Sequence, residues 1–395
     1  MRIGIFTDSY IPRVSGVVRS VEAFTRSLRK RGHQVYVFAP AYPGHYDQDG
    51  DLFRFPSLRL PRYPDFPFAI PYSRRILGRI PQLGLEVAHA HSPFLMGQVA
   101  LCVAKRLGIP LVFTHHTLYT EYLHYVPLIS PRILRPVVLR YTTAYCNRCQ
   151  CVIAPSQAVK TLLQAHGVTA PIEVVPTAGI EPEVFASADP TWVRQRFRIP
   201  WDRPVVITVS RLTKEKSVHL VIEAFREIHR VTGAFLLVVG GGPEERSLRD
   251  LARALGVSDA VVFTGALAHP LVIDCCMASD LFLFASQTET QGIVLVEAMA
   301  AGLPIVAVDA GGVRDAVVEG ITGYLVPPDP RTLAEQAIQL LLDEERRRRM
   351  GGQARELAQS FAVDRLVEKL ERIYFRLSRP LAISSSGKPE GLNQG

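Results

Sequence analysis

Two cations follow an apolar run in the C-terminal half of the sequence, in a pattern that suits phosphate binding. The run PVVITV (204–209) is typical of a buried strand, and the loop SRLTKEK (210–216) comes directly after it with Arg211 and Lys216. An arginine can bind two phosphate oxygens with its forked guanidinium, and a lysine contributes a point charge. The pair therefore predicts a diphosphate site, with an ordinary solvated loop as the alternative.

The segment TETQGIVLVEAMAAGLP (288–304) offers backbone donors for the same kind of ligand. Its aliphatic residues 293–301 are typical of a buried helix. The first amides of a helix lie at the positive end of its dipole, so they can donate to phosphate or sugar oxygens. The amides concerned are those of Gly292, Ile293 and Val294.

Two glutamates, Glu289 and Glu297, flank this expected helix start at a spacing of eight residues. Glu289 belongs to the loop after the strand pattern DLFLFAS, and Glu297 is expected about one turn into the helix. A carboxylate that reaches the cleft can accept hydrogen bonds from two hydroxyls of a ribose. As isolated glutamates, the two would be more typical of ordinary surface positions.

Two loops of the N-terminal half follow strand patterns as well. In SGVV (15–18), Gly16 precedes an expected helix and permits close approach of a ligand to the backbone, with an ordinary glycine turn as the alternative. In FTHHTLYTEYLHY (113–125), a strand ends at His115 and His116, which are followed by aromatic residues. This cluster suits the binding of a sugar or a phosphoester, and packed histidines are the alternative.

Three further patterns are interpreted as structural. VVGGGPEE (238–245) is a turn or a close backbone approach, since the GxxxxGK[ST] signature of a P-loop is missing. DQDGD (47–51) resembles the start of a calcium loop, but its glycine is misplaced and no glutamate closes it. CNRCQC (146–151) lacks the second pair of ligands that a structural zinc needs. No metal site is therefore predicted.

The elements that would position these loops alternate between strand and helix in both halves of the chain. Apolar strand patterns such as RIGIF (2–6) and AFLLVVGGG (234–242) are each followed by a helical pattern. Such alternation predicts parallel sheets covered on both faces by helices, whose ligands bind beyond the carboxyl ends of the strands. The expected fold class is α/β, with two doubly wound Rossmann-like domains.

The domain boundary is expected in the Pro-, Ala- and acid-rich stretch PTAGIEPEVFASADP (176–190). The predicted domains are residues 1–180 and 190–360. Residues 361–378 form an amphipathic helix that is expected to pack back on the N-terminal domain. Residues 380–395 are rich in Ser, Gly and Pro and are expected to be disordered.

The charge is divided unevenly along the 395 residues. Residues 1–170 contain 20 Lys and Arg against 8 Asp and Glu, a net charge of +12, whereas the remainder contains 25 against 29, a net charge of −4. A basic N-terminal domain predicts an anionic ligand or surface, with a generally arginine-rich composition as the alternative. No signal peptide and no run of ~18 apolar residues is recognisable, and the six cysteines are not a disulfide framework, so a cytoplasmic protein is expected.

Taken together and in this order, these loops resemble those of the retaining GT-B glycosyltransferases of family GT4. The resemblance covers about residues 2–375, and its most specific parts are SRLTKEK and TETQGIVLVE followed by AMAAGLPIVA. It implies that the two Rossmann-like domains face each other across a cleft. It also implies transfer of a hexose from a nucleotide sugar with retention of configuration.

The resemblance further implies roles for the matching residues of this sequence. Arg211 and Lys216 hold the donor's diphosphate and stabilise it as the leaving group. Glu289 lies beside the hydroxyls of the donor sugar, and Glu297 binds the ribose. His116 matches the family's active-site histidine. The remaining donor-binding positions are glycines and helix-start amides: Gly16 in the first loop, Gly265 in the base-recognition loop FTGAL (263–267), and Gly292, Ile293 and Val294.

The sequence departs from the family pattern in two places. Many relatives have Gly-Gly in the first loop, where this chain has Ser15 and Gly16. The interdomain stretch usually reads P-x-G-I-[DE], whereas PTAGIE carries an additional residue, Ala178. The resemblance therefore does not define the geometry of the first loop or of the hinge.

The segments FTDSYIPRVSGVV and TETQG look like those of diacylglycerol glucosyltransferases and phosphatidylinositol mannosyltransferases. This likeness implies a donor such as UDP-glucose and a membrane glycerolipid acceptor such as diacylglycerol. Residues 59–79 mix arginines with Phe, Tyr and Ile, a composition that suits an interface with anionic lipid headgroups. A peripheral position on the inner face of the cell membrane is expected.

Several alternative functions stay open. They are GDP-mannose-dependent transfer to phosphatidylinositol, to a polysaccharide or to a soluble sugar, and a nucleotide-sugar epimerase of the same fold. A non-enzymatic nucleic-acid-binding protein would explain the basic half, but no known binding motif is present. A Rossmann dehydrogenase would need GxGxxG with an acid about 20 residues further on, and neither is found. No cofactor or metal is expected, since cations and helix amides can stabilise the leaving diphosphate.

Overall fold

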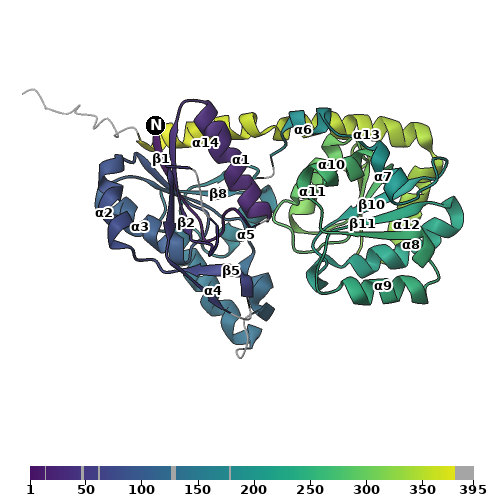
Figure 1. Ribbon diagram of the computed structural model, residues 1–395, viewed down its shortest axis with the longest axis horizontal. Helices are drawn as coiled ribbons and strands as arrows, with labels where there is room; N and C mark the ends of the chain where they lie inside the picture. Colours follow the sequence, from purple (N-terminus) through teal and green to yellow (C-terminus); the bar gives the residue numbers. More distant parts are fainter. Residues whose placement is uncertain (14, 46–48, 61–62, 126–129, 178, 379–395) are drawn as a thin grey trace, which may run out of the picture.

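The computed structural model describes residues 1–378 apart from 14, 46–48, 61–62, 126–129 and 178. Each half of the chain forms a parallel sheet with helices on both faces (Figure 1). The expected α/β class with two Rossmann-like halves is therefore confirmed. Ala178 and the expected disordered tail at 380–395 lie outside the described residues.

The N-terminal sheet has seven parallel strands in the order β3-β2-β1-β6-β7-β8-β9. Its inner strands β6, β7 and β8 are buried at every position, which explains why their sequences are almost continuously apolar rather than alternating. A separate antiparallel hairpin of β4 and β5 follows β3. The bounds are β1 (Arg2–Phe6), β2 (Gln34–Pro40), β3 (Leu52–Phe55), β4 (Ser57–Leu60), β5 (Tyr63–Ala69), β6 (Val87–Ala90), β7 (Leu111–Thr114), β8 (Cys151–Ala154) and β9 (Ile172–Val174).

The C-terminal sheet has six parallel strands in the order β12-β11-β10-β13-β14-β15. The strand order reverses between β10 and β13, as it does between β1 and β6 in the other sheet. Such reversals open a crevice at the carboxyl ends of the strands, where ligands of doubly wound sheets bind. The bounds are β10 (Val205–Val209), β11 (Phe235–Val239), β12 (Val261–Gly265), β13 (Leu281–Phe284), β14 (Ile305–Val308) and β15 (Gly323–Val326).

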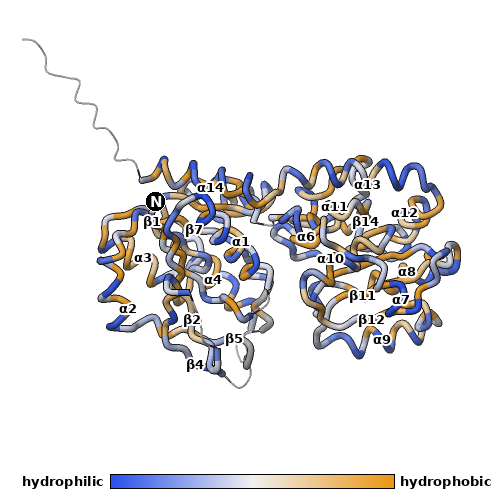
Figure 2. Tube along the Cα trace, turned by 45° about the horizontal axis from the view of Figure 1, so that its top comes forward, coloured by the Kyte–Doolittle hydropathy of each residue, from blue (hydrophilic) through white to orange (hydrophobic). Residues whose placement is uncertain are grey.

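The helices cover both faces of each sheet, and most of them pack an apolar face against the core. Figure 2 shows hydrophobic residues along the strands inside each half and hydrophilic residues on outer helices such as α9. The bounds are α1 (Gly16–Lys30), α2 (Arg74–Arg79), α3 (Leu95–Leu107), α4 (Pro131–Cys146), α5 (Gln157–Ala165), α6 (Pro182–Ala186), α7 (Thr191–Arg196), α8 (Val218–Thr232), α9 (Glu245–Ala254), α10 (His269–Met277), α11 (Ile293–Ala300), α12 (Pro330–Leu342), α13 (Glu344–Ala358) and α14 (Val363–Ser378). None of the helices within the described ranges is long and apolar enough to cross a bilayer.

The last helix, α14, returns from the C-terminal half and lies along the N-terminal one (Figure 1). Its buried residues Leu366 and Leu370 belong to the same apolar cluster as Leu28 of α1. Glu371 adds a polar contact, because it accepts hydrogen bonds from Arg31 and His33 at 2.8 and 2.6 Å. The helix therefore ties the two halves together on the side away from the hairpin.

Candidate active site

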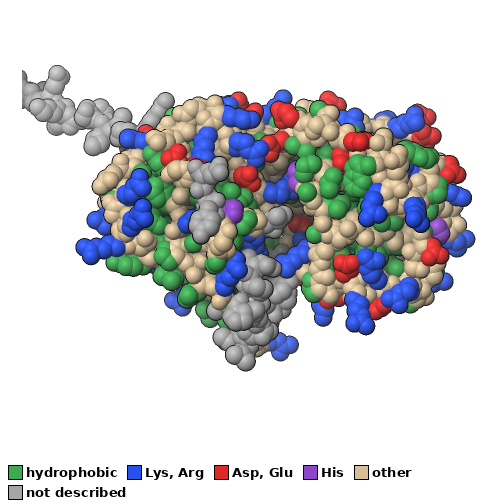
Figure 3. Space-filling view, viewed as in Figure 1, with side chains coloured by type: hydrophobic (Ala, Val, Ile, Leu, Met, Phe, Trp, Pro, Cys, Tyr) green, Lys and Arg blue, Asp and Glu red, His purple; other side chains and the backbone are tan. Residues whose placement is uncertain are grey.

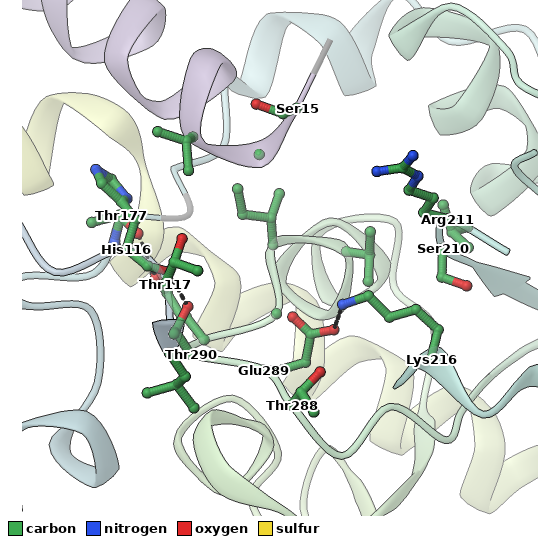
Figure 4. A pocket seen from close by; sticks show the side chains of 18 of the residues that line it. Ser15, His116, Thr117, Thr177, Ser210, Arg211, Lys216, Thr288, Glu289 and Thr290 are labelled. Atoms are coloured by element: carbon green, nitrogen blue, oxygen red, sulfur yellow. Dashed lines mark hydrogen bonds and ion pairs between the residues drawn. The ribbon is translucent and has the colours of Figure 1, made fainter. Parts of the chain in front are cut away.

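The crevices of the two sheets open onto one cavity of about 310 Å³ between the domains. Its walls are the start of α1 and the loops that follow β7, β10 and β13. Figure 3 shows the surface hollowed between the two halves, and Figure 4 shows the lining side chains from close by. The cavity thus collects loops whose sequences lie up to about 280 residues apart, because parallel strands end at the same edge.

Hydrogen bonds join the domains beside this cavity. Thr290, after β13, donates its hydroxyl to the backbone carbonyl of His116 at 2.9 Å (Figure 4). The side-chain oxygen of Gln291 accepts the backbone N–H of Thr177 at 2.7 Å. The loop that follows β13 is therefore held against the N-terminal domain on one side of the cavity.

Lys216 and Glu289 form an ion pair in the wall that the C-terminal domain contributes. Nζ of Lys216 lies 2.5 Å from Oε1 of Glu289, and both side chains are largely shielded from solvent (Figure 4). The guanidinium of Arg211 lies on the same side of the cavity, is exposed, and has no ion pair within the described residues. The arrangement gives the cavity two cations, one held by a carboxylate and one available to an anionic ligand.

The helix α11 begins at the cavity with unused backbone donors. Its preceding residue, Gly292, has a left-handed backbone with φ of 77°, and the helix has no side-chain cap. The amides of Ile293 and Val294 make no hydrogen bond within the described residues. The rest of the helix is buried, so its position is fixed by packing while its N-terminus faces the cavity.

Replacing Gly292 by alanine is expected to lower the free energy of unfolding by about 1–3 kcal/mol. The left-handed backbone disfavours any Cβ, and an added Cβ would lie only 2.9 Å from Cδ1 of Leu295. Chemical unfolding monitored by circular dichroism measures the change. Gly352→Ala is the control, because a Cβ there meets open space within a helix, so its stability should be unchanged or raised. Equal stability of Gly292→Ala and the wild type would contradict the strained geometry.

Glu297 lies one turn further along α11 and is engaged by both domains. Its Oε1 accepts a hydrogen bond from Arg19 of α1 and lies 2.9 Å from Nε2 of His269 in α10. Nη2 of Arg19 also lies 2.6 Å from that histidine nitrogen. Burial alone would raise the pKa of Glu297, but the hydrogen bond from His269 and the charge of Arg19 outweigh it and hold the pKa below its usual value. The carboxylate is thus ionised and already occupied by side chains.

His116 forms part of the wall contributed by the N-terminal domain, opposite Arg211 and Lys216 (Figure 4). Its imidazole is buried and lies 2.8 Å from Nδ1 of a second histidine, His91. Burial lowers the pKa of His116 to about 3, so the ring is neutral near pH 7. His91 was not predicted as a site residue, although it ends the apolar run LEVAHAH (85–91), a strand pattern whose carboxyl end was a usable signal.

In the loop SGVV (15–18), Ser15 and Gly16 form the start of α1. The hydroxyl of Ser15 accepts the backbone N–H of Val18 at 3.3 Å, so the serine acts as the helix N-cap. A Cβ on Gly16 would lie 3.1 Å from Cδ1 of Ile293 in the other domain. A side chain at position 16 would therefore press against Ile293 of the other domain. Ser15, in place of the first glycine of the family pattern, is accommodated as the N-cap.

The cavity collects eight of the ten candidate site residues. These are Gly16, His116, Arg211, Lys216, Glu289, Gly292, Ile293 and Val294. Glu297 and Gly265 do not line it. Gly265 ends β12, and the loop after it leads to a second cavity of about 360 Å³ that Arg19 and His269 also line. The two cavities share Thr177 and Ile293, and the partners of Glu297 line the second one.

Comparison with protein families gives two matches that follow each other along the chain. Residues 14–184 match the family described as Glycosyltransferase Family 4. Residues 192–357 match the family described as Glycosyl transferases group 1. Together they cover both halves of the structure and leave the hinge between them.

Two characterised glycosyltransferases are similar to this chain in sequence over most of their length. The chain is 32% identical to an alpha-monoglucosyldiacylglycerol synthase of Acholeplasma laidlawii, over 81% of this chain and 83% of the relative. It is 31% identical to a GDP-mannose-dependent alpha-mannosyltransferase of Mycobacterium tuberculosis, over 83% of this chain and 84% of the relative. Both similarities extend over the two halves.

Solved structures with the same fold include a sucrose-phosphate synthase from Thermosynechococcus elongatus, with a TM-score of 0.78 and 21% identity, covering 95% of this chain and 98% of that one. The structure of Anabaena HepE in complex with UDP has a TM-score of 0.76 and 22% identity, covering 95% of this chain and 100% of that one. At this level of identity the likeness shows the shared arrangement of two domains.

Proposed function

Because the chain belongs to the GT-B glycosyltransferases of family GT4, we propose that it transfers a hexose from a nucleotide sugar to a hydroxyl group of a membrane glycerolipid. The observation that carries the proposal is the composition of the cavity. Two cations, Arg211 and Lys216, and the free amides at the start of α11 converge on it. These groups suit a nucleoside diphosphate as the leaving group of a sugar.

The proposed mechanism uses this polar wall to stabilise charge that develops as the sugar–phosphate bond breaks. Departure of the diphosphate concentrates negative charge on its terminal oxygens. Arg211 and Lys216 then gain more interaction energy in the transition state than in the ground state, because they are already in place. The amides of Ile293 and Val294 add donors that need no rearrangement.

Glu289 is proposed to serve two groups in turn. In the structure it holds the ammonium of Lys216 at 2.5 Å. Once a donor is bound, the diphosphate competes for the lysine, and the carboxylate can accept hydrogen bonds from sugar hydroxyls. Among the described lining residues it is the one acidic side chain. A pair of carboxyl groups about 5–5.5 Å apart, as retaining hydrolases use, is not formed by these residues.

We propose that transfer proceeds with retention and without a protein carboxylate nucleophile, because Glu289, the one acidic side chain among the described lining residues, is assigned to the sugar hydroxyls. The same cations can neutralise the leaving diphosphate without a metal ion, so we propose that divalent metal is not required. Closure of the domains over the cavity would exclude water and limit hydrolysis of the donor. The hydroxyl of the acceptor is proposed to enter from the side of the N-terminal domain, where His116 lies.

A glucose donor such as UDP-glucose and a diacylglycerol acceptor are supported by the names of the glucolipid synthases to which the chain is similar. A mannose donor is the second candidate, because GDP-mannose-dependent mannosyltransferases are similar over a comparable part of the chain.

The test combines each of the donors UDP-glucose, UDP-galactose and GDP-mannose with each of the acceptors diacylglycerol, phosphatidylinositol and soluble sugars. Mass spectrometry identifies the product, and NMR of its anomeric centre gives the configuration. An α-linked glycolipid is expected, whereas a β-linkage would contradict retention.

A membrane contact is supported by the exposed face of α4. Ile133 and Val137 have exposed fractions of 65% and 61%, and Tyr141 follows on the same face one turn later. The arginines Arg132, Arg135 and Arg140 of the same helix are exposed as well. An apolar stripe with flanking cations suits the boundary between acyl chains and anionic headgroups. Figure 3 also shows Lys and Arg side chains over the outer surface of the N-terminal half.

The double substitution of Ile133 and Val137 by serine is expected to weaken binding to vesicles containing anionic phospholipid by at least about fivefold. Full burial of an apolar side chain contributes roughly 1.5–3 kcal/mol of free energy. A side chain at a membrane interface is only partly removed from water, so it contributes less. Co-sedimentation with anionic and neutral vesicles measures the change. Leu342→Ser, which removes an equally exposed apolar side chain in the other domain, is the control. Unchanged vesicle binding by the double variant would exclude α4 as the contact.

A further inference from the structure

The strand order brings a second histidine to the wall of the cavity. β6 and β7 are neighbours in the N-terminal sheet, with Ala90 paired to Phe113. His91 directly follows β6, and His116 is the second residue after β7. Both histidines therefore lie at the same edge of the sheet. His91 is buried, with an exposed fraction of 4%, and is not among the residues that line the cavity. Any effect of His91 on a ligand must act through His116.

The two imidazoles are joined through ring nitrogens. Nδ1 of His91 lies 2.8 Å from Nε2 of His116, and the rings are stacked with centroids 5.1 Å apart. His89 packs against the His91 ring at 4.2 Å. His89 is itself fixed, because its nitrogens lie 2.7 Å from the hydroxyl of Thr114 and 2.6 Å from that of Tyr374 in α14. His89 therefore packs against His91 from a fixed position.

The protons of the pair can be counted. Burial lowers the pKa of both rings, so each is neutral near pH 7 and carries one proton. One of these protons lies between the rings. If His116 supplied it, the other would sit on Nε2 of His91, which is buried and has no hydrogen-bond partner within the described residues. A buried N–H without an acceptor is rarer in proteins than a buried acceptor without a donor. The favoured arrangement therefore has His91 donating from Nδ1.

We propose that His91 is a positioning residue, which donates to Nε2 of His116 and thereby fixes the tautomer that presents Nδ1–H of His116 to a hydroxyl oxygen of the donor sugar. The inference rests on the proposed transfer reaction, in which His116 lines the donor cavity. Without this hydrogen bond, His116 would divide its population between two tautomers and could turn away from the sugar. Only the tautomer with a proton on Nδ1 donates from that nitrogen.

His91→Phe keeps a ring in the buried space but removes the donor, and it is expected to lower kcat by about 10- to 100-fold. His91→Asn is the conservative variant, because its amide N–H can reach the position that Nδ1 occupies, and it should retain kcat within about threefold. In a His116→Phe background, His91→Phe should cause no further loss, since both act on the same group. The proposal is overturned if His91→Phe keeps wild-type kcat, if both His91 variants lose activity equally while remaining folded, or if the two losses add.

His33→Phe is the control. It also replaces a buried, hydrogen-bonded histidine, but His33 contacts Glu371 at 2.6 Å and lies just before β2, at the edge of the sheet opposite the cavity. Its replacement should change kcat by less than about threefold. Circular dichroism and thermal unfolding of every variant show whether a loss of activity follows from a loss of fold.

A second readout needs no turnover. Nitrogen-15 NMR of the histidine side chains in the wild-type protein should show His116 protonated at Nδ1 and His91 donating to its Nε2, with the His116 tautomer becoming mixed in His91→Phe. A wild-type His116 protonated at Nε2 would overturn the proposal. If the wild type transfers or hydrolyses no donor at all, the proposed function fails, and the NMR result still decides the hydrogen bond between the two rings.

Discussion

Replacing Lys216 by alanine is expected to lower kcat/KM for the nucleotide sugar by about 10²- to 10³-fold. The ammonium lies in the cavity wall, shielded from solvent and held at 2.5 Å by Glu289, so its charge is poorly screened there. Its removal takes one cation from the leaving diphosphate. It also leaves the carboxylate of Glu289 beside the diphosphate without its lysine partner. Steady-state kinetics of nucleoside diphosphate release measures kcat and KM separately.

Two further variants separate these effects. Lys214→Ala removes an exposed cation from the same loop, two residues away, and should leave the kinetics within about twofold of the wild type. Adding Glu289→Gln to Lys216→Ala removes the unpaired negative charge. This double variant should recover part of the loss if repulsion of the diphosphate contributes to it. A Lys216→Ala enzyme with wild-type kinetics would show that this lysine does not meet the donor.

Replacing Glu297 by alanine is expected to raise the donor KM by about 10- to 100-fold while kcat changes less. The carboxylate is buried, and it holds Arg19 from the other domain and His269. Both side chains contact Oε1, so a bound ribose would compete with them for that oxygen. The donor would then lose two hydrogen bonds to a charged group in the alanine variant.

Arg19→Gln distinguishes the two partners of Glu297. If Arg19 competes with the ribose, its removal should leave the affinity for a nucleoside diphosphate unchanged or increase it, as measured by isothermal titration calorimetry with UDP and GDP. Arg26→Gln is the control, since Arg26 lies on the same helix and pairs with Glu181 at 2.7 Å, away from Glu297. Unchanged donor affinity in Glu297→Ala would contradict the assignment of the ribose to this carboxylate.

The pH dependence of this cluster follows from the lowered pKa of Glu297. A carboxylate whose folded pKa is depressed contributes stability at pH values above its unfolded pKa, and this contribution is lost as the pH falls through the folded pKa. The ion pair with Arg19 therefore stays intact through the neutral range and is lost only in acid. Donor affinity measured between about pH 6 and pH 8 should not change because of Glu297.

The strand and helix alternation was sufficient to predict the two parallel sheets, since buried parallel strands are continuously apolar and long helices are periodic. The loops SRLTKEK and TETQG could be placed at the strand ends for the same reason. These short-range patterns do not report which loops meet across the domains. The Arg19–Glu297 contact joins residues 278 positions apart, and it depends on how α1 approaches α10 and α11.

The pair of His91 and His116 shows a second limit of sequence reasoning. Each histidine taken alone is as typical of a packed core as of a site. Only the neighbouring positions of β6 and β7 in the sheet show that the two rings lie within hydrogen-bond distance of each other. In the same way, the sequence of α4 shows an apolar residue at every fourth position but not whether this face is exposed. The exposed fractions of Ile133 and Val137 supply that information.

The most direct test of the proposed function is the release of nucleoside diphosphate from UDP-glucose, UDP-galactose and GDP-mannose by the wild-type protein, with EDTA present and with vesicles containing diacylglycerol or phosphatidylinositol. One donor is expected to support release that depends on the acceptor lipid, persists in EDTA and falls by at least about a hundredfold in Lys216→Ala. Absence of both transfer and hydrolysis with every donor, with or without added divalent metal, would contradict the assignment of this cavity to nucleotide-sugar chemistry.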